Sequence, residues 1–239
     1  MFEWNHLVKK RGLLMRKIFL FAALFSLTFL LACGSSETDE VEEQPTFDIT
    51  AAEKVDPEKV VMQLNGEEVL GDRYNLAYLQ IKVQLFQYGQ DVSNLDDVKE
   101  LAIEALIEQE VLLQDATEKG IEVADADVEA EMELIKTESL DSFETFLETY
   151  KFDEESYKMM LSFAMLYDQY VKDQFADIDV SEEEIEDAYA QLKSENEELA
   201  DLADIKDSLR AGLIQQKENE MVQERLDDLK EQAEIEMNI

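Results

Sequence analysis

The sequence has few of the residues on which disulfide-rich, sheet-rich and nucleic-acid-binding proteins depend. Its 239 residues include one Cys, two Pro and seven Gly. A single thiol excludes an internal disulfide framework. The only glycines after Gly89 are Gly120 and Gly212, and this argues against a sheet-rich fold with a turn every 8–12 residues. Lys and Arg number 21 against 58 Asp and Glu, so the net charge of −37 excludes a basic face for phosphates. A long helical chain with an acidic surface fits this composition better.

The N-terminal 32 residues read as a targeting segment. Basic residues cluster between positions 9 and 17, and the uncharged, largely apolar run Ile18–Ala32 follows. A membrane-spanning helix needs about 20 apolar residues, so this shorter run predicts the apolar core of a signal peptide. Met15 begins a compact signal of its own, and the start is therefore Met1 or Met15.

The end of the apolar run, Leu30-Leu31-Ala32-Cys33, resembles the bacterial lipobox. The resemblance implies cleavage between Ala32 and Cys33 and a diacylglycerol on the Cys33 thiol. Two acyl chains suffice for stable anchoring, so the expected location is the outer face of the bacterial cell membrane. The alternative is an ordinary signal peptide that leaves a free cysteine.

Removal of residues 1–32 leaves little material for catalysis. The only His and the only Trp, His6 and Trp4, leave with the signal, and Cys33 would carry lipid. Nucleophile pairs that use His, and metal sites that use His, are then excluded. The acidic run Asp125–Glu131 has Ala130 where a calcium loop needs glycine. We therefore expect no catalytic residue, no metal and no cofactor.

Residues 33–57 are expected to be the acylated Cys33 followed by an acidic, disordered tether, and residues 58–239 to be one folded domain. The tether has too few apolar residues to offset its ordering entropy. In the domain, Asn65-Gly66 between apolar runs predicts a β-hairpin over 60–70. Apolar periodicity and capping residues predict helices over 72–88, 94–119, from Asp125, from Asp141, over 153–175, from Ser181 and over 201–232. The alternating end, residues 235–239, predicts a strand that joins the hairpin, because a lone hairpin is marginal in water.

Three stretches in this order carry a family resemblance: VVMQLNGEEVL (60–70), LIEQEVLLQDATEKGIEV (106–123) and VSEEEIEDAYAQLK (180–193). Together they resemble the N-terminal chaperone domain of the SurA/PrsA family of extracytoplasmic folding factors. The resemblance implies a mainly α fold, with a helical chaperone domain and a small hairpin joined by the C-terminal strand. In PrsA-like foldases a parvulin prolyl isomerase domain precedes the closing helix. Residues 194–208 are too few to hold that domain, so we expect no isomerase activity.

A chaperone of this type needs exposed apolar surface that adapts to many clients. The helix over 153–175 has apolar side chains on two opposite faces, and the alternative is that both faces belong to the core. Methionine suits promiscuous contacts because it is flexible and polarizable. The candidate client-binding residues are Met159, Phe163, Leu166 and Tyr170, with Tyr78 and Phe86 from the helix over 72–88.

The sequence thus predicts an ATP-independent chaperone for apolar segments of unfolded or newly translocated proteins, with no nucleic-acid partner. An alternative is a structural or adaptor lipoprotein that holds one envelope partner. Another is a degenerate foldase that has lost its isomerase. The negative charge indicates either solubility alone or a preference for basic clients, which salt would weaken.

Overall fold

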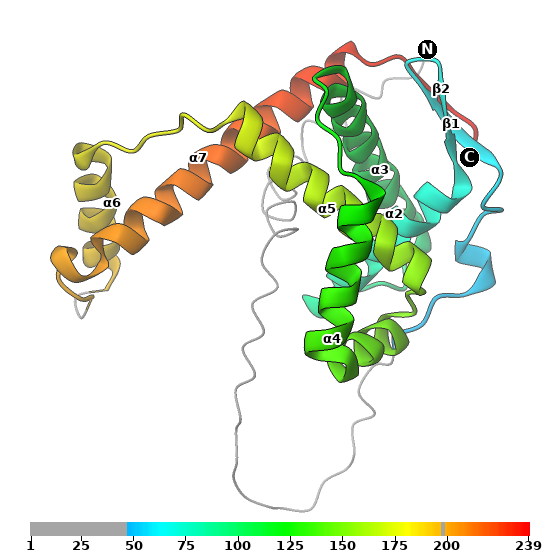
Figure 1. The fold of residues 1–239 in the computed structure, drawn as a ribbon, viewed down its shortest axis with the longest axis horizontal. Helices are drawn as coiled ribbons and strands as arrows, with labels where there is room; N and C mark the ends of the chain where they lie inside the picture. The colour runs from blue at the N-terminus through cyan, green and yellow to red at the C-terminus, as the bar shows by residue number, and fades with distance from the viewer. Residues whose placement is uncertain (1–46, 197–198) are drawn as a thin grey trace, which may run out of the picture. The chain divides into compact units, whose positions relative to one another are not determined.

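The computed structural model describes residues 47–196 and 199–239 (Figure 1). The expected signal peptide, Cys33 and most of the expected tether lie outside the described residues. The elements are, in chain order, η2 (Ala51–Glu53), β1 (Val60–Leu64), β2 (Glu67–Leu70), α2 (Gly71–Gln87), α3 (Leu95–Glu118), α4 (Asp125–Tyr150), α5 (Glu154–Gln174), α6 (Glu182–Glu195), α7 (Leu202–Gln232) and β3 (Ile235–Met237). The predicted fold class, mainly α with a small closed hairpin, is confirmed.

The sheet joins the first and last strands of the described chain. Its order is β2-β1-β3, and β3 runs antiparallel to β1, with Leu64 opposite Ile235. Asn65 and Gly66 turn the hairpin with φ of 54° and 83°, a region that favours these two residue types. The predicted pairing of the C-terminal strand with the hairpin is therefore confirmed. The third strand covers β1, which would otherwise be an open edge.

Helices α2 and α3 follow the sheet and form the centre of the core. Leu106 of α3 and Ala77 of α2 are fully buried. Gly120 ends α3 with φ of 73°, the left-handed conformation expected of a C-terminal glycine. Gly71, at the start of α2, has a different reason to be glycine: an added Cβ would lie 2.0 Å from the backbone oxygen of Asp56.

The region after Asp125 folds as two helical pieces, as the sequence predicts. Ser139 interrupts α4 with φ of −147° and ψ of 38°, and the helix resumes before Asp141. Asp153 then caps α5, because its side chain accepts from the backbone N–H of Ser156 at 2.7 Å. Ser181, the predicted helix start, forms a capping box with Glu184 at the beginning of α6.

The boundary expected at residue 57 is wrong, because the ordered fold extends to Phe47. Phe47 is buried in a cluster with Leu76, Leu79, Val83 and Phe152. Glu53 forms an ion pair with Lys82, and both side chains are almost fully buried. The acidic composition of this segment predicted disorder, but the ion pair with Lys82, the buried ring of Phe47 and the hydrogen bonds between the Val55 backbone and Asn75 attach it to α2.

Helix α7 contacts two different parts of the fold (Figure 1). Its first half packs against α6, and residues 182–217 are called the α6–α7 hairpin below. Its second half packs against α3. The body is defined as residues 47–174. Within the described ranges, no helix is both long enough and apolar enough to cross a membrane.

Candidate functional site

A partly open groove lies between α2, α3 and α5, and we call it the α5 groove. Its volume is about 370 Å³. Its lining consists of Arg73, Leu76, Gln80, Gln109, Leu113, Thr117, Ile121, Glu122, Val123, Met159, Met160, Ser162, Phe163 and Leu166. The three helices are apolar on the sides that meet here, and the groove is where their side chains do not fill the space between them.

The groove combines apolar walls with a few polar groups. Met159 and Phe163 are half-buried, so both present surface to solvent as well as to the groove. On the polar side, Nε2 of Gln109 donates to Oε1 of Gln80 at 3.2 Å. Such a lining can hold apolar side chains of a peptide and hydrogen-bond its backbone.

One ion pair lies at the edge of the α5 groove. Nη2 of Arg73 is 2.8 Å from Oε1 of Glu110. Burial raises the pKa of Glu110, and the nearby Arg73 charge opposes that rise. The pair holds α2 and α3 together beside the groove.

The six predicted client-binding residues do not lie together. Met159, Phe163 and Leu166 line the α5 groove, with Leu166 only 6% exposed and therefore at its floor. Phe86 packs instead on the cluster around Phe47, and the centres of those two rings are 5.5 Å apart.

Tyr78 and Tyr170 are not accessible to a client, because only 2% and 1% of their surfaces are exposed to solvent. Tyr78 donates from its hydroxyl to Oε1 of Glu53 at 3.3 Å. Burial, followed by the Glu53 charge, raises the pKa of Tyr78. The alternative interpretation, that an aromatic stripe belongs to the core, holds for these two residues.

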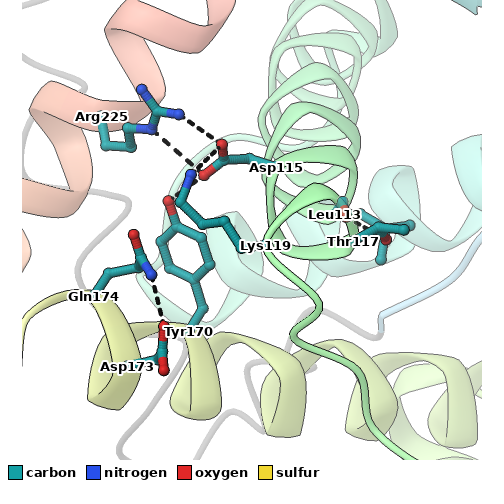
Figure 2. Close-up of polar contacts among 8 residues, drawn as sticks. All are labelled: Leu113, Asp115, Thr117, Lys119, Tyr170, Asp173, Gln174 and Arg225. Carbon is teal, nitrogen blue, oxygen red and sulfur yellow. Dashed lines mark hydrogen bonds and ion pairs between the residues drawn. The ribbon is translucent and has the colours of Figure 1, made fainter.

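Tyr170 belongs to a polar cluster that connects three helices (Figure 2). Asp115 of α3 accepts hydrogen bonds from the Tyr170 hydroxyl of α5, from Nζ of Lys119 at 2.6 Å and from Nη2 of Arg225 of α7 at 2.6 Å. Burial alone would raise the pKa of Asp115, but the hydrogen bonds from Arg225, Lys119 and Tyr170 outweigh it and lower the pKa to about 2. Burial, followed by the bond to Asp115, raises the pKa of Tyr170 to about 12.

This cluster was not predicted, although the sequence contains a feature that indicates it. Asp115 follows Val111 and Leu112 by four and three positions, and therefore lies on the apolar side of α3. A carboxylate on an apolar helix face needs a partner. Glu108 is a second case, since its Oε1 accepts from Nζ of Lys230 of α7 at 2.6 Å. The two carboxylates identify the face of α3 on which α7 docks, although not the helix that supplies the cations.

A second groove lies in the α6–α7 hairpin and was not predicted. Its volume is about 470 Å³, and we call it the hairpin groove. Its lining consists of Ala188, Gln191, Leu192, Ile205, Ser208, Leu209, Gly212, Leu213 and Gln216. Within residues 47–196 and 199–239, no group of His, Cys, Asp or Glu side chains is arranged to hold a metal ion.

Comparison with known proteins agrees with this architecture. The family model of the SurA-like N-terminal domain matches residues 5–161. The chain is 27% identical over 189 residues to "Foldase protein PrsA" of Caldanaerobacter subterraneus subsp. tengcongensis, covering 74% of this chain and 52% of the relative. It is also 27% identical over 201 residues to "Foldase protein PrsA 2" of Bacillus cereus, covering 82% of this chain and 55% of that protein.

The chain thus spans about half the length of the curated relatives it matches. The matched family domain begins well before the hairpin and ends inside α5, so it contains β1, β2, α2, α3 and α4, whereas the closing strand β3 lies outside it. Two of the three helices that form the α5 groove therefore lie wholly inside the matched region, and the third begins there. The chain belongs to the family of the SurA-like N-terminal domain, within a wider similarity to PrsA foldases.

Proposed function

We propose that this protein is a membrane-anchored, extracytoplasmic chaperone that binds apolar segments of unfolded or newly translocated proteins without ATP. The observation that carries the proposal is the α5 groove, in which flexible Met159 and Met160 lie beside the half-exposed ring of Phe163. Such side chains adapt to differently shaped apolar partners. The family membership supports a chaperone-type role.

The mechanism needs binding and release but no chemical step. Apolar side chains of a client would leave water on entering the groove, a gain of about 25 cal/mol for each Å² buried. Gln80 and Gln109 supply hydrogen-bonding groups for a client backbone at the polar side of the groove. Binding of this kind is weak and reversible, so a client can leave and fold. The sequence contains no P-loop, and this agrees with ATP independence.

The proposal includes a lipid anchor on Cys33 and no isomerase activity. The lipobox resemblance at Leu30–Cys33 supports the anchor. The short connection between α6, which ends at Glu195, and α7, which begins at Leu202, supports the lack of an intervening isomerase domain.

A light-scattering experiment tests the chaperone proposal. Two unrelated enzymes are diluted from denaturant with and without the chain from Gly34 to Ile239, and aggregation is followed. We expect suppression by the wild type and a weaker effect of Phe163→Ser, which removes the ring from the α5 groove. The matched control is Leu134→Ser, because Leu134 is 47% exposed on α4 and lines neither groove.

Circular dichroism melting of both variants separates loss of binding from loss of fold. Failure of the wild type to suppress aggregation of either enzyme would remove the chaperone proposal. Capture of one stoichiometric partner, without any general suppression, would favour the adaptor alternative. For the anchor, Cys33→Ser should abolish incorporation of a labelled fatty acid and release the protein from cell membranes.

A further inference from the structure

The hairpin groove is separate from the α5 groove and shares none of its lining residues. Its apolar surface comes from four side chains that the two helices leave only partly covered, Leu192, Ile205, Leu209 and Leu213. Leu192 is 40% exposed. Ala188 and Gly212 keep the groove hollow, and a Cβ added at Gly212 would meet no atom within 4 Å.

Exposed carboxylates of both helices lie close in the sequence to the residues that line this apolar surface. Each of four exposed acidic residues lies one helical turn from a groove residue: Asp187 and Glu195 flank Gln191, Asp201 precedes Ile205, and Asp204 precedes Ser208. None of the four has an ion pair with a described residue, which leaves their charge available to a partner.

The basic residues of the hairpin are already engaged within it. Lys206 and Arg210 both pair with Glu182, and Nη2 of Arg210 lies 2.5 Å from its carboxylate. Lys217 pairs with Glu184 at 2.7 Å, and Nζ of Lys193 donates to the backbone oxygen of Leu199 at 2.6 Å. The ion pairs of Lys206, Arg210 and Lys217 offset the charges of Glu182 and Glu184 at the start of α6, whereas Lys193 bonds to a neutral oxygen and keeps its charge. The four unpaired carboxylates outnumber that one positive charge, so the groove margin stays negative.

This charge distribution discriminates among partners. A second copy of the chain would bring another net charge of −37, and an anionic membrane surface would bring like charge as well. Both would be repelled. An amphipathic helix with Lys or Arg on both sides of an apolar stripe matches the apolar floor and the acidic margins at once.

We propose that the hairpin groove is a docking site for a basic amphipathic helix supplied by another protein. The apolar stripe of that helix lies over Leu209, Gly212 and Leu213, and its basic residues face the carboxylates at positions 187, 195, 201 and 204. This site goes beyond the proposed client binding in the α5 groove and does not depend on it.

The test uses the full chain in nanodiscs of zwitterionic lipid, with empty nanodiscs as the blank. The probe is a fluorescent 18-residue amphipathic peptide of Leu and Lys, and its counterpart has every Lys replaced by Glu. Fluorescence anisotropy measures binding of each peptide to the wild type and to two variants. Gly212→Leu fills the groove, and Ala211→Leu makes a similar change at the neighbouring exposed position, which does not line the groove.

We expect the Lys peptide to bind the wild type and Ala211→Leu equally, with Gly212→Leu weaker by roughly tenfold or more, because a central apolar contact is blocked. Affinity should fall as salt is raised. Both variants should fold, because Leu favours helix more than Gly does and meets open space at position 212.

Equal binding of the Lys peptide to Gly212→Leu, or equal binding of the Glu peptide to the wild type, would overturn the proposal. A dimer of the chain that Gly212→Leu abolishes, detected by analytical ultracentrifugation, would assign the groove to a second copy instead. Phe163→Ser should still bind the Lys peptide, because Phe163 lines the α5 groove and not the hairpin groove. A failure of this docking site can therefore be distinguished from a failure of the proposed client binding.

Discussion

The body and the α6–α7 hairpin are both helical, but different forces hold them together. In the body, side chains such as Val61, Leu106 and Val111 are removed from water almost completely. Among the described residues of the hairpin, Ile185 is the one buried apolar side chain. Ion pairs such as those of Glu182 and Glu184 supply much of the remaining contact.

This difference teaches how one chain can offer two kinds of surface. The deeply buried core of the body fixes the positions of α2, α3 and α5. The α5 groove between these helices is therefore preformed. Exposed ion pairs each contribute only about 0–1 kcal/mol, so the hairpin is held less firmly. It keeps its apolar surface accessible because too few side chains meet there to close it. Segments with few buried contacts open locally at lower free-energy cost.

The largest expected effect is in the body. Leu106→Ala should lower the free energy of unfolding by about 3 kcal/mol, because Leu106 is fully buried and the substitution leaves a cavity. The corresponding change in the hairpin, Leu209→Ala, should cost about 1 kcal/mol, because part of that side chain is already in water. Urea denaturation followed by circular dichroism measures both. Equal losses would show that the hairpin is packed as tightly as the body.

A smaller effect concerns the cluster that connects the body to α7. The folded pKa of Asp115 is about 2, below its usual 3.8, so its stabilisation is fully present above about pH 4 and is lost as the pH falls towards 2. The shift corresponds to about 2 kcal/mol. Asp115→Asn should lower stability at pH 7 by about that amount and should remove the corresponding part of the acid dependence, measured by urea denaturation from pH 7 to pH 2.

The matched control for that experiment is Asp168→Asn. Asp168 is an exposed carboxylate of α5 whose partner is Lys172, four residues further along the same helix. It should change neither the stability at pH 7 nor its acid dependence by more than about 0.5 kcal/mol. If Asp115→Asn has the acid dependence of the wild type, other carboxylates control it and the cluster is not the connection that we describe.

The smallest effect is at the N-cap of α6, the residue just before the hairpin. Ser181→Ala removes the hydroxyl that accepts from the backbone N–H of Glu184 at 3.2 Å, and should cost about 1 kcal/mol. Because the cap acts on α6 alone, amide hydrogen exchange should become faster in α6 and stay unchanged in α2 and α3. Faster exchange throughout the body would mean that the two regions unfold as one unit.

Much of the fold was predictable because its determinants are local. The turn at Asn65-Gly66, the end of α3 at Gly120 and the caps at Asp153 and Ser181 each depend on a few neighbouring residues, and all four are confirmed. The break in α4 was also predictable, because a second helix start is encoded close to Asp141.

The candidate site was predictable only in part. Periodicity identified α5 as apolar on two faces, but it could not separate Phe163, which lines a groove, from Tyr170, which bonds to buried Asp115. The docking of Phe47 and Glu53 was missed for the same reason, since their partners lie in α2 and beyond. The hairpin groove was missed because the apolar periodicity of each helix does not show how completely the two helices pack against each other.

The sequence by itself determined the helical class, the positions of turns and caps, the closing strand and the acidic surface. These follow from backbone conformations and hydrogen bonds within a few residues, and from composition. Only the tertiary structure decided which apolar side chains are sealed, which line the two grooves and which carboxylates find cations. Burial depends on both of the surfaces that meet, and here the second surface comes from residues far away in the sequence. Arg225, for example, pairs with Asp115.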